Sequence, residues 1–263
     1  MQTILAVLNG TAAAPAVLTA AGLAAARLGL ASIEVVHVRP PADPSFMPSE
    51  EAMTPARAAA FAADVAAQTA ALRAVVAAWQ AAAPGMTAAW REIAGAERKT
   101  VAGESRGAAL TVLGAPPDAP AEAITATLFD AAATVLLVPP AVPASLGAHV
   151  AVAWKPGAAA ERAVEAALPF LRAAARRTVL VGNEAGGAPA LPAALSGIGA
   201  ADLRTFDAAV PDLGAAIQRV ALEAGADLLV TGAYSHTRMF ERILGGATRE
   251  ILHGVMLPVL MRH

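Results

Sequence analysis

The feature that most constrains the fold is an alternation of short apolar runs with alanine-rich stretches, which occurs twice along the 263 residues. Each apolar run has the length of a β-strand, and each alanine-rich stretch has the length of a helix. The predicted strands are 3–8, 32–38, 87–93, 108–113 and 134–138, and then 150–154, 178–181, 202–206, 227–231 and 255–261. Because apolar strands that alternate with helices are typical of parallel sheets, the sequence predicts an α/β fold with two five-stranded parallel sheets, each with helices on both faces.

The helices predicted between these strands differ in length between the two halves. They are 12–28, 54–83, 97–104 and 119–131 in the first half, and 158–174, 213–224 and 248–253 in the second. The long helix 54–83 has a proline in its first turn, where proline is tolerated, and a broad apolar stripe. Such a stripe normally covers a sheet, and a surface for a partner is the alternative. At the position of helix 54–83, the second half has the glycine- and proline-rich segment 184–199, where we expect at most a turn or two of helix.

A proline-rich linker separates the two copies of the pattern. It reads Pro139-Pro140-Ala141-Val142-Pro143, and placing Ile4 on Val150 sets Asn9 against Lys155. The chain is therefore predicted to contain a duplicated domain of about 130 residues rather than a short-period repeat. We place the two domains at residues 1–143 and 144–263.

Composition excludes several classes of protein. The chain has no cysteine, which removes disulfides, thiolate catalysis and cysteine-ligated metal sites. Its net charge is −2, so it has no basic surface for a duplex, and we expect no nucleic-acid partner. The uncharged stretches 1–26 and 131–154 are interrupted by turn residues or prolines, and the first lacks the basic residues of a signal peptide. We expect no membrane span and a cytoplasmic protein.

Ligands of open parallel sheets bind at the carboxyl ends of the strands, where the strand order reverses. In the order 3-2-1-4-5 this crevice lies between the first and fourth strands. In the second half, the loops that meet there are 154–157 and the segment that begins at Gly232. The five histidines form no His-x3-His pair, and no nucleophile elbow, P-loop or GxGxxG motif occurs. We therefore expect a binding site in these two loops and no catalytic residues.

The segment after the fourth strand of the second half is rich in groups that bind anions. Gly232 lets the chain turn off the strand, and Gly245-Gly246 lets backbone amides approach an anion directly before a helix. The free N–H groups at a helix start carry partial positive charge and suit a phosphate. Further donors and cations in the segment are Ser235, His236, Arg238, Arg242 and Thr248. The alternative is a simple helix-entry turn with solvated arginines.

This segment resembles the nucleotide signature of the universal stress proteins of the bacterial UspA type, G-x2-G-x9-G-(S/T). Gly232 and Gly245 match the signature, and Ser235 stands where its second glycine belongs. Gly246 stands where Ser or Thr is usual, and Thr248 supplies a hydroxyl two residues later. The closing stretch 251–260 also resembles the family's final strand, which pairs with its counterpart across a dimer. The chain thus resembles a tandem, two-domain universal stress protein.

The resemblance implies two Rossmann-like (adenine nucleotide alpha hydrolase-like) domains that form an intramolecular pseudo-dimer, with a further homodimer left open. It implies that the second domain binds ATP or AMP, with Mg²⁺ able to accompany ATP. Adenine would lie near the end of the second strand and the sugar near the end of the first. The implied nucleotide-binding residues are Ala153, Trp154, Lys155, Val181, Gly232, Ser235, His236, Arg238, Gly245, Gly246, Ala247 and Thr248. The implied role is regulatory, in a stress response, and not enzymatic.

Two departures from the family's pattern separate the halves. ATP-binding members usually carry an aspartate after the first strand, whereas this chain has Asn9 in the first half and Lys155 in the second. Lys155 either meets a phosphate or is solvated. After the fourth strand, the first half has Gly114 followed by three prolines within 115–120, which lack the amide donors of an anion site. We therefore interpret the first half as a degenerate copy that packs against the second.

Two other functions compete with nucleotide binding. The first is a nucleotide-independent protein-interaction module with both sites decayed, which Ser235 and Lys155 favour. The second is an enzyme, which the absence of a recognisable base, nucleophile or metal cluster disfavours. Trp154 could stack on a base or lie in the core between the halves, and we favour the core. His37, inside a predicted strand, is expected to have a core or strand-end role.

Overall fold

The computed structural model describes residues 3–43, 53–116, 121–183, 193–208, 210–233 and 246–263. In the first half the strands are β1 (Ile4–Val7), β2 (Ser32–Arg39), β3 (Thr87–Ala94), β4 (Leu110–Gly114) and β5 (Val135–Val138). The helices between them are α1 (Ala14–Arg27), α2 (Pro55–Ala82), α3 (Glu97–Ser105) and α4 (Ala121–Thr125), which continues into a π-helical turn, η1 (Ala126–Asp130). Every strand and helix predicted for this half is present, with ends that differ by a few residues.

The second half repeats this order with one change. Its strands are β6 (His149–Trp154), β7 (Arg176–Asn183), β8 (Asp202–Asp207), β9 (Leu228–Gly232) and β10 (Val259–Arg262). Its helices are α5 (Ala158–Ala173), α6 (Leu213–Glu223) and α7 (Gly246–His253), with a short 3-10 helix, η2 (Ala193–Ile198), where the first half has α2. The final strand is shorter than predicted: it begins at Val259, directly after Pro258, which cannot donate a backbone hydrogen bond to a sheet.

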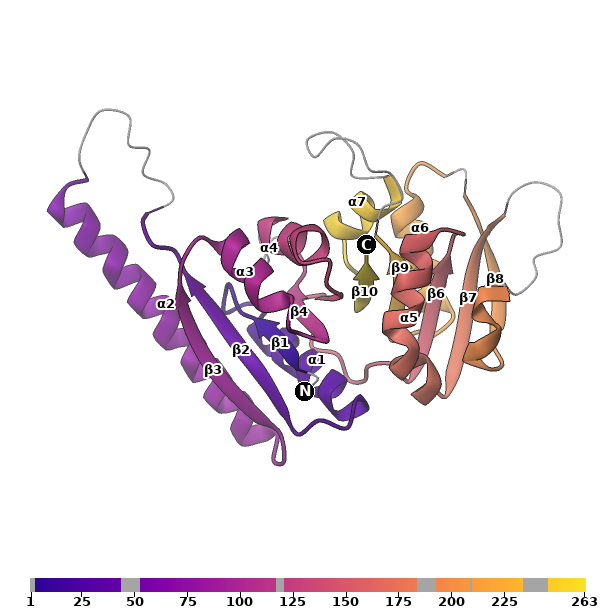
Figure 1. Ribbon diagram of the computed structural model, residues 1–263, viewed down its shortest axis with the longest axis horizontal. Coiled ribbons are helices and arrows are strands. Elements are labelled where there is room, and N and C mark those ends of the chain that lie inside the picture. The colour runs from indigo at the N-terminus through magenta and orange to yellow at the C-terminus, as the bar shows by residue number, and fades with distance from the viewer. Residues whose placement is uncertain (1–2, 44–52, 117–120, 184–192, 209, 234–245) are drawn as a thin grey trace.

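The described strands form a single 10-stranded sheet in the order β3-β2-β1-β4-β5-β10-β9-β6-β7-β8. All neighbours are parallel except β5 and β10, which pair antiparallel through Leu136 and Leu260. Each half therefore has the predicted strand order 3-2-1-4-5, and the halves lie side by side with their fifth strands joined (Figure 1). The predicted fold class is confirmed. The boundary that we place at residues 143 and 144 falls in the segment between β5 and β6 and stays a prediction.

Two hydrophobic layers cover the sheet, one on each face. Successive residues of a strand point to opposite faces, so Ile4 and Ala6 lie in the layer with α1 and α5, and Leu5 and Val7 in the layer with α3 and α4. The second layer also contains residues of α6 and α7. The central strands are buried on both faces, which explains why they are continuous apolar runs.

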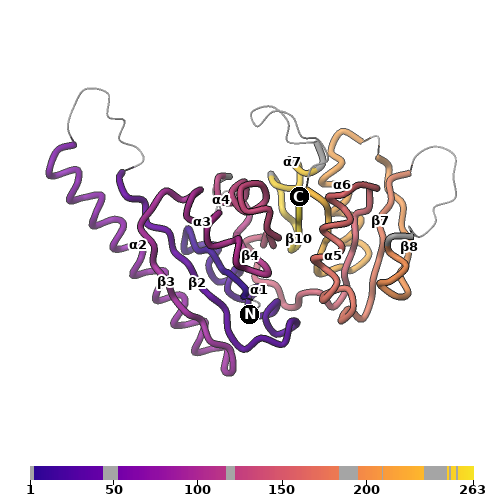
Figure 2. The backbone as a smooth tube through the Cα atoms, viewed as in Figure 1, coloured from indigo at the N-terminus to yellow at the C-terminus, as the bar shows by residue number. Residues whose placement is uncertain are grey.

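The long helix α2 covers the sheet with a narrow stripe. Thr54 caps it by accepting a hydrogen bond from the backbone N–H of Arg57, and Pro55 lies in its first turn. Only Thr69, Leu72 and Val76 are buried along its 28 residues, and its first turns extend past the strands (Figure 2). Among the described helices, α2 alone has the length and composition to cross a membrane, a property that it shares with core helices of soluble proteins. The alternative of a partner surface on α2 stays a prediction.

Candidate functional site

In the second half the strand order reverses between β6 and β9, as predicted. These strands are neighbours in register, with Val150 beside Leu228 and Ala153 beside Thr231. Their chains then diverge, β6 into α5 and β9 towards α7. Because the strands are parallel, both connections leave from the same edge of the sheet. The two loops predicted to meet at a binding site therefore start next to each other.

Gly232 is packed against the first turn of α5. A Cβ atom at this position would lie 2.6 Å from the backbone nitrogen of Ala160 and 2.7 Å from the carbonyl carbon of Ala159. This close approach of two backbones accounts for the glycine, whose φ is outside the left-handed region, and the turn that we expected after it stays a prediction. The end of β9 and the start of α5 are thus in direct backbone contact.

The start of α5 has no side-chain cap. Gly157 occupies the N-cap position with a φ of 154°, a conformation that suits glycine, and among the described residues no N-cap side chain accepts a hydrogen bond from the first turn. The first turn of α5 therefore keeps amides without an N-cap side-chain partner, and the exposed Lys155 lies two residues before the N-cap.

Besides Lys155 and Gly232, six of the predicted site residues lie in the described part of the chain, in three places. Ala153 and Trp154 at the end of β6 are 8% and 7% exposed, and Trp154 belongs to the hydrophobic layer of α1 and α5. Val181 is the register partner of Trp154 on β7 and is half-buried. Gly246 and Ala247 begin α7, and Thr248 is 9% exposed in its first turn.

Four of the predicted residues lie outside the described part of the chain. These are Ser235, His236, Arg238 and Gly245. The described groups that the fold does bring to one edge are the ends of β6, β7 and β9 and the first turn of α5. They supply backbone amides, the Lys155 ammonium group and a half-buried apolar surface at Val181.

The equivalent crevice of the first half is almost filled. It lies between β1 and β4, and its lining leaves no room for a water molecule. Its lining consists of Val7, Leu8, Asn9, Gly10, Ala13, Ala14, Val17 and Gly114. The backbone carbonyl of Asn9 accepts a hydrogen bond of 2.8 Å from Gln68 Nε2 on α2. The loop after β1 is thus tied to α2, which has no counterpart of similar length among the described residues of the second half.

Acidic groups also lie at this edge of the first half. Burial, and next the charge of Glu122, raise the pKa of Glu97, while a hydrogen bond from the Asn9 side chain lowers it. Glu97 begins α3 and Glu122 lies in the first turn of α4. Carboxylates beside the loop after β1 repel phosphate. The second half has acidic groups at the corresponding place. Asp212 is the N-cap residue of α6, and Glu250 of α7 accepts a hydrogen bond of 2.6 Å from the Gly214 amide, so this feature does not distinguish the halves.

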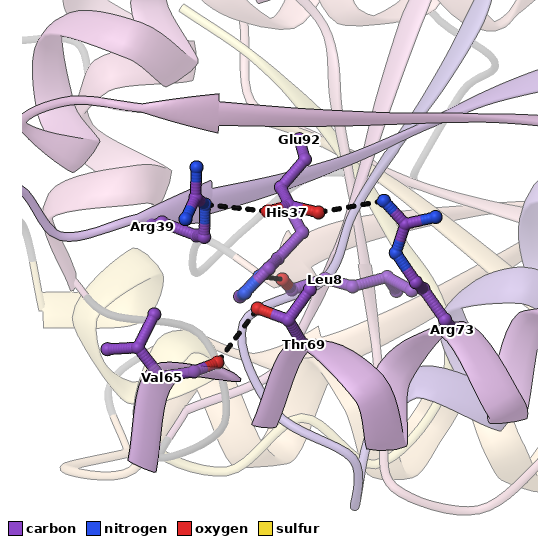
Figure 3. Close-up of polar contacts among 7 residues, drawn as sticks. All are labelled: Leu8, His37, Arg39, Val65, Thr69, Arg73 and Glu92. Carbon is purple, nitrogen blue, oxygen red and sulfur yellow. Dashed lines mark hydrogen bonds and ion pairs between the residues drawn. The ribbon is translucent and has the colours of Figure 1, made fainter. Parts of the chain in front are cut away.

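His37 occupies the position in the first half that corresponds to Val181. It lies beside Leu8, is 2% exposed, and donates from Nδ1 to the backbone carbonyl of Leu8 at 2.9 Å (Figure 3). Its ring lies 5.9 Å from that of Trp90. The expected core role of His37 is consistent with these contacts, and its side chain fills the place where the second half has a half-buried valine.

An ion-pair group next to His37 fastens β2, β3 and α2 together. Glu92 on β3 pairs with Arg39 at 2.7 Å and with Arg73 of α2 at 2.9 Å (Figure 3). The hydrogen bond from Arg73, with the charge of Arg39, lowers the pKa of Glu92. The Arg73 guanidinium also lies 5.2 Å from the centre of the Trp90 ring. These contacts fasten α2 to β2 and β3.

Comparisons with known proteins give a consistent result for the fold. No protein-family model matches the chain, and no curated protein matches it significantly. Among solved structures, a universal stress protein from Archaeoglobus fulgidus matches with a TM-score of 0.68 at 16% identity, covering 98% of this chain and 96% of that one. The chain has the universal stress protein fold.

Two structures from Pseudomonas aeruginosa share this universal stress protein fold. One is a protein of unknown function, with a TM-score of 0.57 at 15% identity, and the other a candidate universal stress protein, with a TM-score of 0.56 at 14% identity. Each match covers 99% of this chain and 92% of the other. The resemblance found in the sequence is thus confirmed for the fold of the whole chain, and the chemistry of the site follows from the chain's own residues.

Proposed function

We propose that the second half binds an adenine nucleotide, ATP or AMP, and that the protein has a regulatory role of the universal stress type without enzymatic turnover. The observation that carries this proposal is the contact of Gly232 with the uncapped first turn of α5, where the strand order reverses. Two backbones meet there without side chains between them, beside Lys155. Free amides and a cation at the end of parallel strands suit a phosphate group.

The nucleotide would lie along the edge formed by β7, β6 and β9. Its phosphates would contact amides around Gly232, Gly246 and Ala247, with Ser235, Thr248 and Lys155 assisting. Adenine would lie near Val181 and the sugar near Ala153. The described residues contain no group of three His, Asp or Glu side chains that could hold a metal ion. Mg²⁺ would therefore arrive on the phosphates of ATP rather than in a protein-held site.

Bound nucleotide is the direct test. The purified protein would be denatured and its supernatant assayed for ATP, ADP and AMP, and the nucleotide-free protein would be titrated with each by calorimetry. Lys155→Ala should weaken ATP binding more than AMP binding, because AMP has fewer phosphate charges. Asn9→Ala at the equivalent position of the first half is the matched control and should leave both affinities unchanged. Equal loss in both variants, or none, contradicts the proposed site.

The second candidate function is a protein-interaction module that needs no nucleotide. The exposed length of α2 favours it, since only three of its 28 residues are buried. Absence of bound nucleotide, together with no heat of binding for ATP or AMP, would favour this function. We place either function in the cytoplasm, in keeping with the absence of cysteine.

A further inference from the structure

His263 makes a specific hydrogen bond to the residue that follows β9. Its Nδ1 lies 2.8 Å from the carbonyl oxygen of Ala233, and because a carbonyl only accepts, Nδ1 is the donor. The amide of Ala233 in turn donates to the carbonyl of Arg262 at 2.9 Å. Ala233 is fully buried, so neither of its backbone groups can exchange these partners for bulk water.

His263 is itself held from two sides. Arg162 of α5 donates from Nε to the backbone carbonyl of His263 at 2.8 Å. The Phe129 ring of η1, in the first half, packs edge-on against the His263 ring with 4.8 Å between centres. The contacts form a closed path: the first turn of α5 touches Gly232, the next residue is bonded to His263, and His263 is bonded back to α5.

We propose that His263 is a positioning residue for the nucleotide site, and that Phe129 is the contact through which the first half supports it. The proposal rests on the proposed function of the second half. The imidazole holds the Ala233 carbonyl and so keeps the end of β9 against α5. It acts through backbone position and does not touch the nucleotide. The first half would thus support the nucleotide site of the second half through the packing of Phe129 against His263.

Three variants separate the hydrogen bond from the ring contact. His263→Phe keeps a ring against Phe129 and removes the donor, whereas His263→Asn keeps a donor at the same distance from Cβ and removes the ring. Phe129→Leu removes the aromatic contact from the other side. We expect His263→Phe to weaken ATP binding about fivefold, the effect of losing one buried hydrogen bond. His263→Asn should restore most of the affinity, and Phe129→Leu should have an intermediate effect.

Hydrogen exchange at the Ala233 amide gives a second readout that needs no nucleotide. Its exchange should quicken in His263→Phe and stay near the wild-type rate in His263→Asn, with the far-ultraviolet circular dichroism unchanged in both. If the wild type binds ATP and His263→Phe binds equally well with unchanged exchange, the positioning role is wrong and the proposed function stands. If no form binds nucleotide, the proposed function fails and the positioning role fails with it, whatever the exchange rates.

Discussion

Replacing Gly232 by alanine should separate the end of β9 from α5. The new methyl carbon would lie 2.6 Å and 2.7 Å from two backbone atoms of the α5 first turn, Ala160 N and Ala159 C. Ordinary contacts of such atoms are about 3.5 Å, so α5 or β9 must shift by about 0.9 Å. Backbone atoms inside a helix cannot rotate away as the end of a side chain can. Overpacking of this kind costs about 3 kcal/mol at the upper end of its range.

Part of this cost is offset in the unfolded chain. Alanine has less backbone freedom than glycine, which favours the folded state by about 0.7 kcal/mol when the native φ suits alanine, as it does here. We therefore expect Gly232→Ala to lower the free energy of unfolding by about 2 kcal/mol, measured by urea denaturation followed by circular dichroism.

Gly103→Ala is the matched control for this substitution. Gly103 lies within α3, and a Cβ atom there would meet no atom within 4 Å. Alanine at this position should stabilise the protein by about 0.8 kcal/mol through its higher helix propensity. The packing explanation for Gly232 is refuted if both substitutions shift the urea midpoint in the same direction.

Three further predictions concern other parts of the molecule. Burial raises the pKa of Glu97, so its ionised form is disfavoured in the folded state. Glu97→Gln should therefore unfold at a higher urea concentration than wild type at pH 7. This gain should vanish below about pH 4, where the carboxyl group is protonated in both the folded and the unfolded state. Burial lowers the pKa of His149, so the free energy of unfolding of the wild type should fall as the pH drops below about 6.5. His149→Gln should flatten this pH dependence in urea denaturation. A variant with the same pH dependence as wild type would contradict the role of His149. Leu72 of α2 is fully buried, so Leu72→Ala should lower the free energy of unfolding in urea by about 3 kcal/mol. The neighbouring Ala71 is exposed, so Ala71→Ser should change it by less than about 0.5 kcal/mol.

Local pattern was sufficient to predict the strands and helices of each half, whereas the strand order was taken from that of open doubly wound sheets. The run Val135–Val138 is entirely apolar because β5 is buried on both faces, and this pattern survives in any arrangement that covers both faces of a sheet. The prolines of 139–143 lie between β5 and β6 for a similar local reason, since proline cannot continue a strand or helix. The apolar stripe of α2 packs inward, as predicted. It is narrower than the composition of the helix indicated, because only Thr69, Leu72 and Val76 are buried.

The candidate site was only partly predictable. Gly232 was singled out from its place after the fourth strand, but the reason for it is a contact with Ala159 and Ala160, which lie more than 70 residues away in the chain. The approach of Glu97 to Asn9 was missed, because the two residues meet only when α3 packs beside β1. His263 carried no signal at all in the sequence, since its bond to Ala233 depends on the pairing of β10 with β9.

What could be predicted from the sequence and what could not differ in how far apart along the chain the interacting residues lie. Hydrophobic period, turn residues and the repeated order act over a few residues, so the α/β class and the two-fold repetition could be read along the chain. The contact of Gly232 with α5, the hydrogen bond of His37 to Leu8 and the approach of Glu97 to Asn9 form only after folding. These contacts join residues far apart in sequence within one half of the chain, and the pairing of the tenth strand with the fifth adds contacts between the halves, such as that of Phe129 with His263.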